Sequence, residues 1–359
     1  MKILFISNTY KAGEPARGFC YSYLNYYPSL TKMDNARHQI IYFPVDENVM
    51  KEGLEAAKEK LIEIVNREKP ALIFYDEGEL GNDGLAKMKT AAEKVGAKTF
   101  FWACDDNWAF DTASKQFFPY FHWIATMDSL APPKYKKLGF KNIIHAQCAC
   151  NHFDFKPPSQ GLPKIYDVTF VGQPHGQRRK KIEQLKKIGI KVNCWGYGWP
   201  AGVVDFKEML RIIYQSKINL NFTECSGTLT KRLASIFLRR AGERNRKIFV
   251  NNPKGWSNNV KSFCGSFRPQ IKGRNFEIPA CRSFLLTEYA DNLKDYYDIG
   301  REIACFDGIK DCAKKIGYYL ARDKEREEIA KAGYERTIRD HTYEKRFNEI
   351  FKAIGLSAD

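Results

Sequence analysis

The chain has 359 residues, 44% of them hydrophobic, and a formal net charge of +16. This length predicts two domain cores, which that share of hydrophobic residues can fill. The sequence has no run of about 18 apolar residues, and its first residues, MKILFISNTY, lack the features of a secretory signal. We therefore expect a cytoplasmic protein with reduced cysteines, and we exclude a membrane-spanning protein and a small disulfide-stabilised domain.

Short apolar runs alternate with helical patterns along the first 150 residues. Helical patterns cover stretches such as 53–67 and 84–95. The alternation predicts a parallel, doubly wound sheet. Its expected strands are 2–7, 39–45, 71–76, 98–103, 123–127 and 142–146.

A second series of strands and helices follows the segment FKPPSQGLPKIY, which contains three prolines and no periodic pattern. Strands are expected at 167–171, 191–195, 217–222 and 284–287, and the chain ends in about 30 residues of helix. We therefore divide the chain into four parts: an N-terminal Rossmann-like domain (1–155), a linker (156–166), a second Rossmann-like domain (167–335) and a terminal helix (336–359).

A basic insertion is expected at residues 229–274. Residues 231–274 hold twelve Lys or Arg and one acid, Glu243, so +11 of the net charge lies there. Its apolar residues Leu229, Leu233, Ile236 and Phe237 share one helical face. Such a helix could lie on an anionic membrane, contact nucleic acid, dock on the protein's own core or remain solvated; charge alone does not separate lipid from nucleic acid.

Two glycine-containing loops at the start of the second domain are candidates for ligand binding. In VTFVGQPHGQRRKKIEQL, Gly172 allows a close turn, and Arg178 or Arg179 could accompany the helix N-terminus in facing an anion. The same pattern fits a plain turn before a solvated basic helix. In KVNCWGYGWPAG, Tyr197 or Trp199 could stack on a base or sugar, although we slightly favour a core role for these aromatic rings.

The most specific segments are RNFEIPACRSFLLTEYADNLKDYYDIGREIACF, residues 274–306, and AGYERTIRDHTYEKRF, residues 332–347. Residue by residue they resemble the CgeB-like spore-maturation family of glycosyltransferases. The resemblance implies the GT-B architecture, in which two Rossmann-like domains face a cleft and a C-terminal helix braces the N-terminal domain. It also implies sugar transfer from a UDP- or GDP-linked donor to an unidentified acceptor, with retention and without a metal.

The resemblance assigns roles to residues near the start of a short helix. Glu277 would accept hydrogen bonds from the ribose hydroxyls, and Lys272 and Arg274 would neutralise the pyrophosphate. Alternatively, Glu277 caps its helix and the two bases are surface charges.

The chain departs from the pattern of related sequences at two points. Pro269 stands where many retaining enzymes have the first glutamate of Glu-x7-Glu. Arg282 and Ser283 replace two glycines after Ala280 and Cys281, and Arg282 could instead reach a phosphate.

Two acidic residues are the candidate catalytic groups. Asp105 and Asp106 follow the strand KTFFWAC at its carboxyl end, where open parallel sheets bind ligands, and either could act as a general base on an acceptor hydroxyl. Helix capping is the alternative. No metal is expected, and Cys148, Cys150 and His152 are interpreted as part of an ordinary strand end or linker.

The preferred hypothesis is therefore a glycosyltransferase that takes a nucleotide sugar as co-substrate and needs no other cofactor. A nucleotide-sugar epimerase or a phosphorylase of the same fold is one alternative. A basic protein that binds nucleic acid or an anionic membrane is another, and in the latter case it would be peripheral to the membrane.

Overall fold

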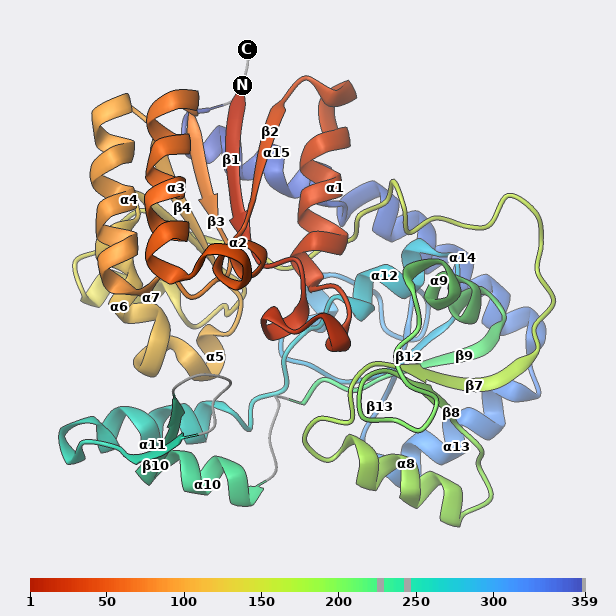
Figure 1. Cartoon of the computed structure of the whole chain (residues 1–359). Helices are drawn as coiled ribbons and strands as arrows, with labels where there is room; N and C mark the ends of the chain where they lie inside the picture. The colour runs from red at the N-terminus through yellow and green to blue at the C-terminus, as the bar shows by residue number, and fades with distance from the viewer. Residues whose placement is uncertain (225–228, 242–246, 357–359) are drawn as a thin grey trace.

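The computed structural model describes residues 1–224, 229–241 and 247–356. Two α/β domains, each built on a parallel sheet, lie side by side, and a smaller lobe lies below the N-terminal domain (Figure 1). The predicted pair of Rossmann-like sheets is therefore present.

The N-terminal sheet has the strand order β2-β1-β3-β4-β5-β6, and every neighbouring pair is parallel. Its strands are β1 (Lys2–Ser7), β2 (Gln39–Pro44), β3 (Leu72–Tyr75), β4 (Lys98–Ala103), β5 (Trp123–Thr126) and β6 (Ile143–His145). Its helices are α1 (Tyr21–Ala36), α2 (Val45–Glu52), α3 (Leu54–Glu68), α4 (Gly81–Val95), α5 (Asp106–Ala109), α6 (Lys115–Phe117) and α7 (Pro132–Lys137). Short 3-10 turns at Lys11–Gly13, Pro15–Arg17 and Phe118–Tyr120 and a π-turn at Phe110–Ser114 complete the domain.

The second sheet has the order β13-β12-β9-β7-β8 and is also parallel throughout. Its strands are β7 (Tyr166–Val171), β8 (Asn193–Trp195), β9 (Ser216–Asn221), β12 (Leu285–Glu288) and β13 (Ala304–Phe306). Its helices are α8 (Arg178–Lys187), α9 (Phe206–Tyr214), α12 (Arg274–Ala280), α13 (Gly308–Leu320) and α14 (Asp323–Asp340), with a 3-10 turn at Leu293–Asp295.

The predicted terminal helix is two helices. Helix α14 ends at Asp340, and α15 (Tyr343–Ala353) begins after Thr342, whose side chain accepts a hydrogen bond from the Lys345 amide. The break arises because Thr342 pairs with Cys150 in a β-bridge, which requires extended backbone there. Helix α15 then packs against α1 and lies behind the strands of the N-terminal sheet in Figure 1, so the predicted brace is confirmed even though the single continuous helix was wrong.

The brace is an aromatic contact. Tyr343 and Phe347 of α15 lie against Trp102 of β4 and Tyr26 of α1, with ring centroids 4.8–6.2 Å apart. All four side chains are buried in one core cluster that includes residues of both domains. A second cluster on the opposite side of the N-terminal sheet packs under α3 and α4.

The inserted lobe comprises α10 (Leu229–Phe237), the antiparallel pair β10 (Leu238–Ala241) and β11 (Lys247–Val250), a 3-10 turn at Pro253–Gly255, and α11 (Trp256–Gly265). It leaves the second domain after β9, but α11 packs on α5 and the π-turn of the N-terminal domain. The approach is close at Gly265, where a Cβ atom would lie 2.1 Å from the Asn107 carbonyl oxygen. The lobe therefore connects the two domains.

Candidate active site

Five positively charged side chains converge where the loops of the two domains meet, and we call them the cationic cluster: Lys11, Arg17, Arg178, Lys272 and Arg274. Lys11 is exposed as a whole residue, but the protein around its ammonium removes part of the hydration. This desolvation lowers the pKa of Lys11 to about 8, and three positive neighbours add to the effect: Arg178, Arg274 and Arg17. Burial, together with Lys11 and other members of the cluster, likewise lowers the pKa of His175 to about 4. Mutually repelling cations at this density make a site for a multiply charged anion such as a diphosphate.

Arg178 shapes the loop that follows β7. Its guanidinium donates hydrogen bonds to the carbonyls of Gln173 (3.1 Å) and Phe222 (3.0 Å) and lies 5.7 Å from the ring centroid of Phe170. These contacts fix the loop against β9. The predicted site residue Arg178 therefore has a positioning contact as well as its place in the cluster.

The two glycine loops predicted at the start of the second domain pack on each other. The carbonyl oxygen of Gly172 accepts a hydrogen bond from the Trp199 indole (2.8 Å). Gly196, at a φ of 132°, approaches so closely that a Cβ atom would lie 2.6 Å from the same oxygen. Trp199 is thus a core residue, whereas Tyr197 is 43% exposed and has the Arg17 guanidinium 5.3 Å from its ring centroid.

Glu277 is buried in the first turn of α12 and links the two domains. One carboxylate oxygen accepts a hydrogen bond from the Asn25 amide of α1 at 2.8 Å, and the other is ion-paired with Arg274. Glu277 does not cap α12; instead the Asn275 side chain accepts a hydrogen bond from the Lys272 amide at 2.9 Å. A ribose would have to share or replace the contact with Asn25.

Lys272 and Arg282 lie on opposite sides of α12 in the sequence and differ in their surroundings. The Lys272 ammonium donates to the Gln270 side chain at 2.5 Å, and Gln270 donates in turn to the Cys104 carbonyl of the N-terminal domain at 2.7 Å. Arg282 is exposed and follows the C-terminal end of α12, about 12 Å along the helix direction from Arg274. It adopts a left-handed φ of 51°, the conformation of the glycine it replaces. We therefore leave Arg282 out of the donor site.

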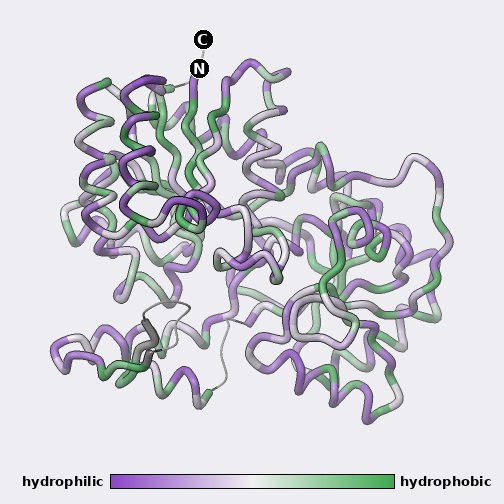
Figure 2. Tube along the Cα trace, in the orientation of Figure 1, coloured by the Kyte–Doolittle hydropathy of each residue, from purple (hydrophilic) through white to green (hydrophobic). Residues whose placement is uncertain are grey.

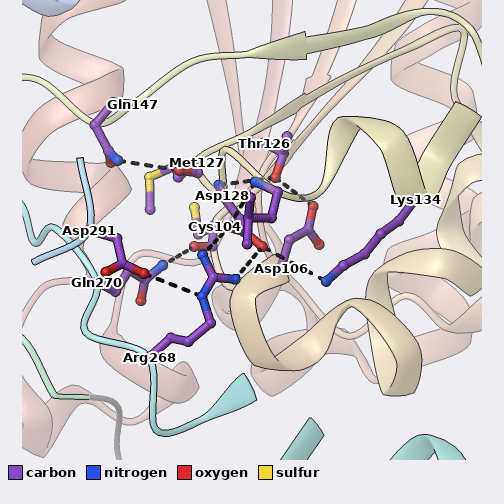
Figure 3. Close-up of polar contacts among 11 residues, drawn as sticks. Cys104, Asp106, Thr126, Met127, Asp128, Lys134, Gln147, Arg268, Gln270 and Asp291 are labelled. Carbon is purple, nitrogen blue, oxygen red and sulfur yellow. Dashed lines mark hydrogen bonds and ion pairs between the residues drawn. The ribbon is translucent and has the colours of Figure 1, made fainter. Parts of the chain in front are cut away.

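The two predicted catalytic carboxylates point in different directions. Asp106 is fully buried and accepts hydrogen bonds from the Thr126 hydroxyl (2.7 Å) and the Tyr135 hydroxyl (3.1 Å). Burial raises its pKa to about 6. Figure 3 shows that Asp106 points toward Thr126. It is thus a structural link between α5, β5 and α7, and we therefore do not place this predicted base on the acceptor side of the site.

Asp105 is exposed just before α5, without capping that helix through its side chain. It lies near Glu77, which follows β3, because its charge helps to raise the pKa of the Glu77 carboxyl after the larger effect of burial. Lys11 acts on Glu77 in the opposite direction, so these three groups are electrostatic neighbours. Beside Glu77, burial raises the pKa of Asp76 to about 8, and the hydroxyl of Ser7 donates to its carboxylate at 3.3 Å.

Sequence reasoning missed Lys11, Arg17 and Glu77. Each follows a strand of the N-terminal sheet at its carboxyl end, the criterion that selected Asp105. The loop KAGEPARG after the first strand also carries glycines beside bases. Applied to every strand, the criterion would have found all three residues.

Arg268, which follows the inserted lobe in the sequence, makes further contacts between the two domains (Figure 3). The Arg268 guanidinium makes two hydrogen bonds to the buried Asp128 carboxylate, at 2.9 and 3.2 Å, and one to Asp291 at 3.4 Å. Two parallel bonds between a guanidinium and a carboxylate give a stronger and more directional link than a single contact. Arg268 therefore fastens the segment after the lobe to the N-terminal domain.

The arrangement of possible metal ligands and the character of the helices relate to metal and membrane binding. Within the described ranges, no group of three or more His, Cys, Asp or Glu side chains is arranged to hold a metal ion. Of Cys148, Cys150 and His152, the two cysteines are buried and the histidine faces Glu344 at 3.5 Å. Among the helices that the structure describes, none combines the length and apolar character needed to cross a bilayer.

Comparisons with known proteins agree with this arrangement. Residues 244–352 match the model of a family described as Glycosyl transferase-like. The chain is 23% identical over 263 residues to the spore protein CgeB of Bacillus subtilis (strain 168), covering 72% of this chain and 75% of CgeB. HepE from Anabaena in complex with UDP-glucose is similar in structure, with a TM-score of 0.63, 9% identity and 99% of both chains covered. Sucrose-phosphate synthase from Thermosynechococcus elongatus gives a TM-score of 0.61 at 11% identity, with 99% of this chain and 100% of the other covered.

The fold and the matched segment define a glycosyltransferase of GT-B architecture, which confirms the predicted fold class and enzyme class. Within that class the chain is similar to CgeB, the likeness that the segment FEIPAC (residues 276–281) indicated.

Proposed function

We propose that the enzyme transfers a sugar from a uridine-diphosphate donor, with retention and without a metal. The observation that carries the proposal is the cationic cluster, which brings five bases from both domains together; desolvation, with added repulsion from Arg178, Arg274 and Arg17, lowers the pKa of Lys11 there to about 8. A diphosphate leaving group would relieve this repulsion, and fixed cations would stabilise its charge in the role that a metal fills elsewhere. The similar HepE structure holds UDP-glucose, which favours uridine over guanosine.

The remaining residues of the site divide into a donor and an acceptor side. On the donor side we place Tyr197 near the nucleotide, Glu277 near its ribose and the Gly172 loop near its phosphates. On the acceptor side we place Asp105 and Glu77. In a retaining transfer a donor phosphate oxygen can take the proton of the acceptor hydroxyl, so these carboxylates would mainly orient the acceptor. We further propose a cytoplasmic enzyme whose residues 229–274 contact a polyanion.

The direct test is thermal unfolding of the full chain with UDP, GDP and UMP. A nucleotide at about 100 times its dissociation constant should stabilise the protein by about 2.7 kcal/mol. We expect UDP to stabilise it most, because UMP lacks the second phosphate and GDP differs in the base. No stabilisation by any nucleoside diphosphate would contradict the proposal.

The acceptor side can be tested with neighbouring carboxylates. We expect Asp105→Asn and Glu77→Gln each to slow UDP release from the donor by about tenfold, with donor affinity unchanged, because they would orient the attacking hydroxyl or water. The matched control is Asp106→Asn, which should change stability but not the rate. If all three variants release UDP from the donor at the same rate, the assignment of Asp105 and Glu77 to the acceptor side is wrong.

A further inference from the structure

Large exposed apolar side chains gather on the inserted lobe. Among the described residues, 23 large hydrophobic side chains are exposed, and ten of them lie between positions 229 and 267. Val250 is 73% exposed and Ile248 is 61% exposed. Exposed apolar residues scattered singly are ordinary, but a gathering of this size in one lobe marks an interaction surface.

Six of these side chains form two sets that adjoin in the sequence at residues 237 and 238. Leu229, Leu233 and Phe237 are four residues apart on α10, so they make one stripe along the helix. Leu238 follows directly and pairs with Val250 across the β10–β11 ribbon, and Ile248 is on the same face as Val250 because it is two residues away. We call these six residues the insertion surface.

The charge around the insertion surface is positive. Residues 231–265 of the lobe hold nine Lys or Arg and one acid, a net charge of +8, and Lys231 and Lys254 are exposed. Apolar and polar residues alternate along the trace of this lobe in Figure 2. Because the lobe packs on the N-terminal domain through α11, the insertion surface is carried by α10 and the ribbon rather than by the docked helix.

We propose that the insertion surface attaches the enzyme to an anionic lipid bilayer. The apolar side chains would enter the boundary between headgroups and acyl chains, and the lysines would face the anionic headgroups. A second copy of the same surface would bring two strongly positive segments together, which opposes self-association. Nucleic acid would match the charge but offers no hydrocarbon layer for aliphatic side chains such as Leu233 and Ile248.

The proposal goes beyond sugar transfer and does not depend on the donor site. The full chain is floated with neutral phosphatidylcholine vesicles and with vesicles that also contain phosphatidylglycerol. We expect flotation with the anionic vesicles only, and a loss of that binding between about 50 and 200 mM NaCl, because bound bases are screened and counterions return to the membrane.

Two kinds of variant separate the apolar and the charged contributions. Leu233→Asn with Ile248→Asn should weaken binding to anionic vesicles by at least about tenfold. Lys231→Gln with Lys254→Gln should weaken it and reduce its dependence on salt. The matched control, Leu138→Asn with Ile188→Asn, changes two equally exposed apolar residues outside the lobe and should bind as the unchanged protein does. Stabilisation by UDP, measured on every variant, shows whether the fold is intact and reports the donor site separately.

Three results would overturn the proposal. The first is no flotation of the unchanged protein with anionic vesicles at low salt. The second is a shift of duplex DNA that the asparagine substitutions leave intact, which would assign the bases to nucleic acid. The third is a dimer in solution that Leu233→Asn dissociates, which would make this surface a contact between copies of the chain.

Discussion

Replacing Lys11 with Met is expected to lower kcat/KM for the nucleotide sugar by about a hundredfold, because a fixed cation is lost where the leaving group gains charge. Binding of UDP should weaken more than binding of UMP, since we place the diphosphate at the cationic cluster. Calorimetry with the two nucleotides measures this difference. Equal losses for UDP and UMP would show that Lys11 does not sense the terminal phosphate.

The same residue gives the site a pH dependence. With a pKa of about 8, Lys11 is mostly charged at pH 7 and mostly neutral at pH 9. The charge of UDP itself is nearly constant over this range, because its last proton leaves near pH 6. UDP affinity should therefore fall as the pH rises from 7 to 9. Lys11→Arg should remove that dependence while keeping the affinity, and Lys11→Met should remove both.

Replacing Glu277 with Ala is expected to weaken the binding of UDP and UMP alike, by about 1.5–3 kcal/mol, because both ligands carry the ribose. The free energy of unfolding should also fall, since Asn25 and Arg274 lose their partner on a buried carboxylate. Calorimetry and chemical denaturation measure the two effects on the same protein.

Asn25→Ala is the matched control for Glu277. It removes the contact between the domains but keeps the carboxylate and its ion pair with Arg274. We expect a smaller loss of stability and no loss of nucleotide affinity. If Glu277→Ala destabilises the protein without weakening either nucleotide, Glu277 is an interdomain contact and the ribose assignment falls.

The fold could be predicted from the sequence because the patterns that indicate its strands and helices are local in the chain. Alternation of strands and helices predicted both sheets, and the FEIPAC segment predicted the nucleotide-binding half. The break between α14 and α15 was not visible, because it depends on the pairing of Thr342 with Cys150, residues 192 positions apart in the chain.

Only part of the candidate site could be predicted from the sequence, because some of its residues come together only in the folded chain. Lys272 and Arg274 were found through their place in a recognisable segment, whereas Lys11 and Arg17 join them only when the domains pack together. Asp105 and Asp106 are adjacent, and both follow the same strand. The two carboxylates have different surroundings because hydrogen bonds from the hydroxyls of Thr126 and Tyr135 hold Asp106 inside the domain.

The position of α15 has a consequence for how the chain can be divided. A fragment that ends at residue 155 keeps the six strands of the N-terminal sheet, but Trp102 and Tyr26 lose the aromatic cover of Tyr343 and Phe347. The complementary fragment keeps its own sheet and core but carries those two rings without the N-terminal sheet that covers them. Both pieces then expose part of the shared core, so the two halves should unfold in a single cooperative transition rather than independently. In a growing polypeptide, the first domain would be completed only after the last helix has left the ribosome.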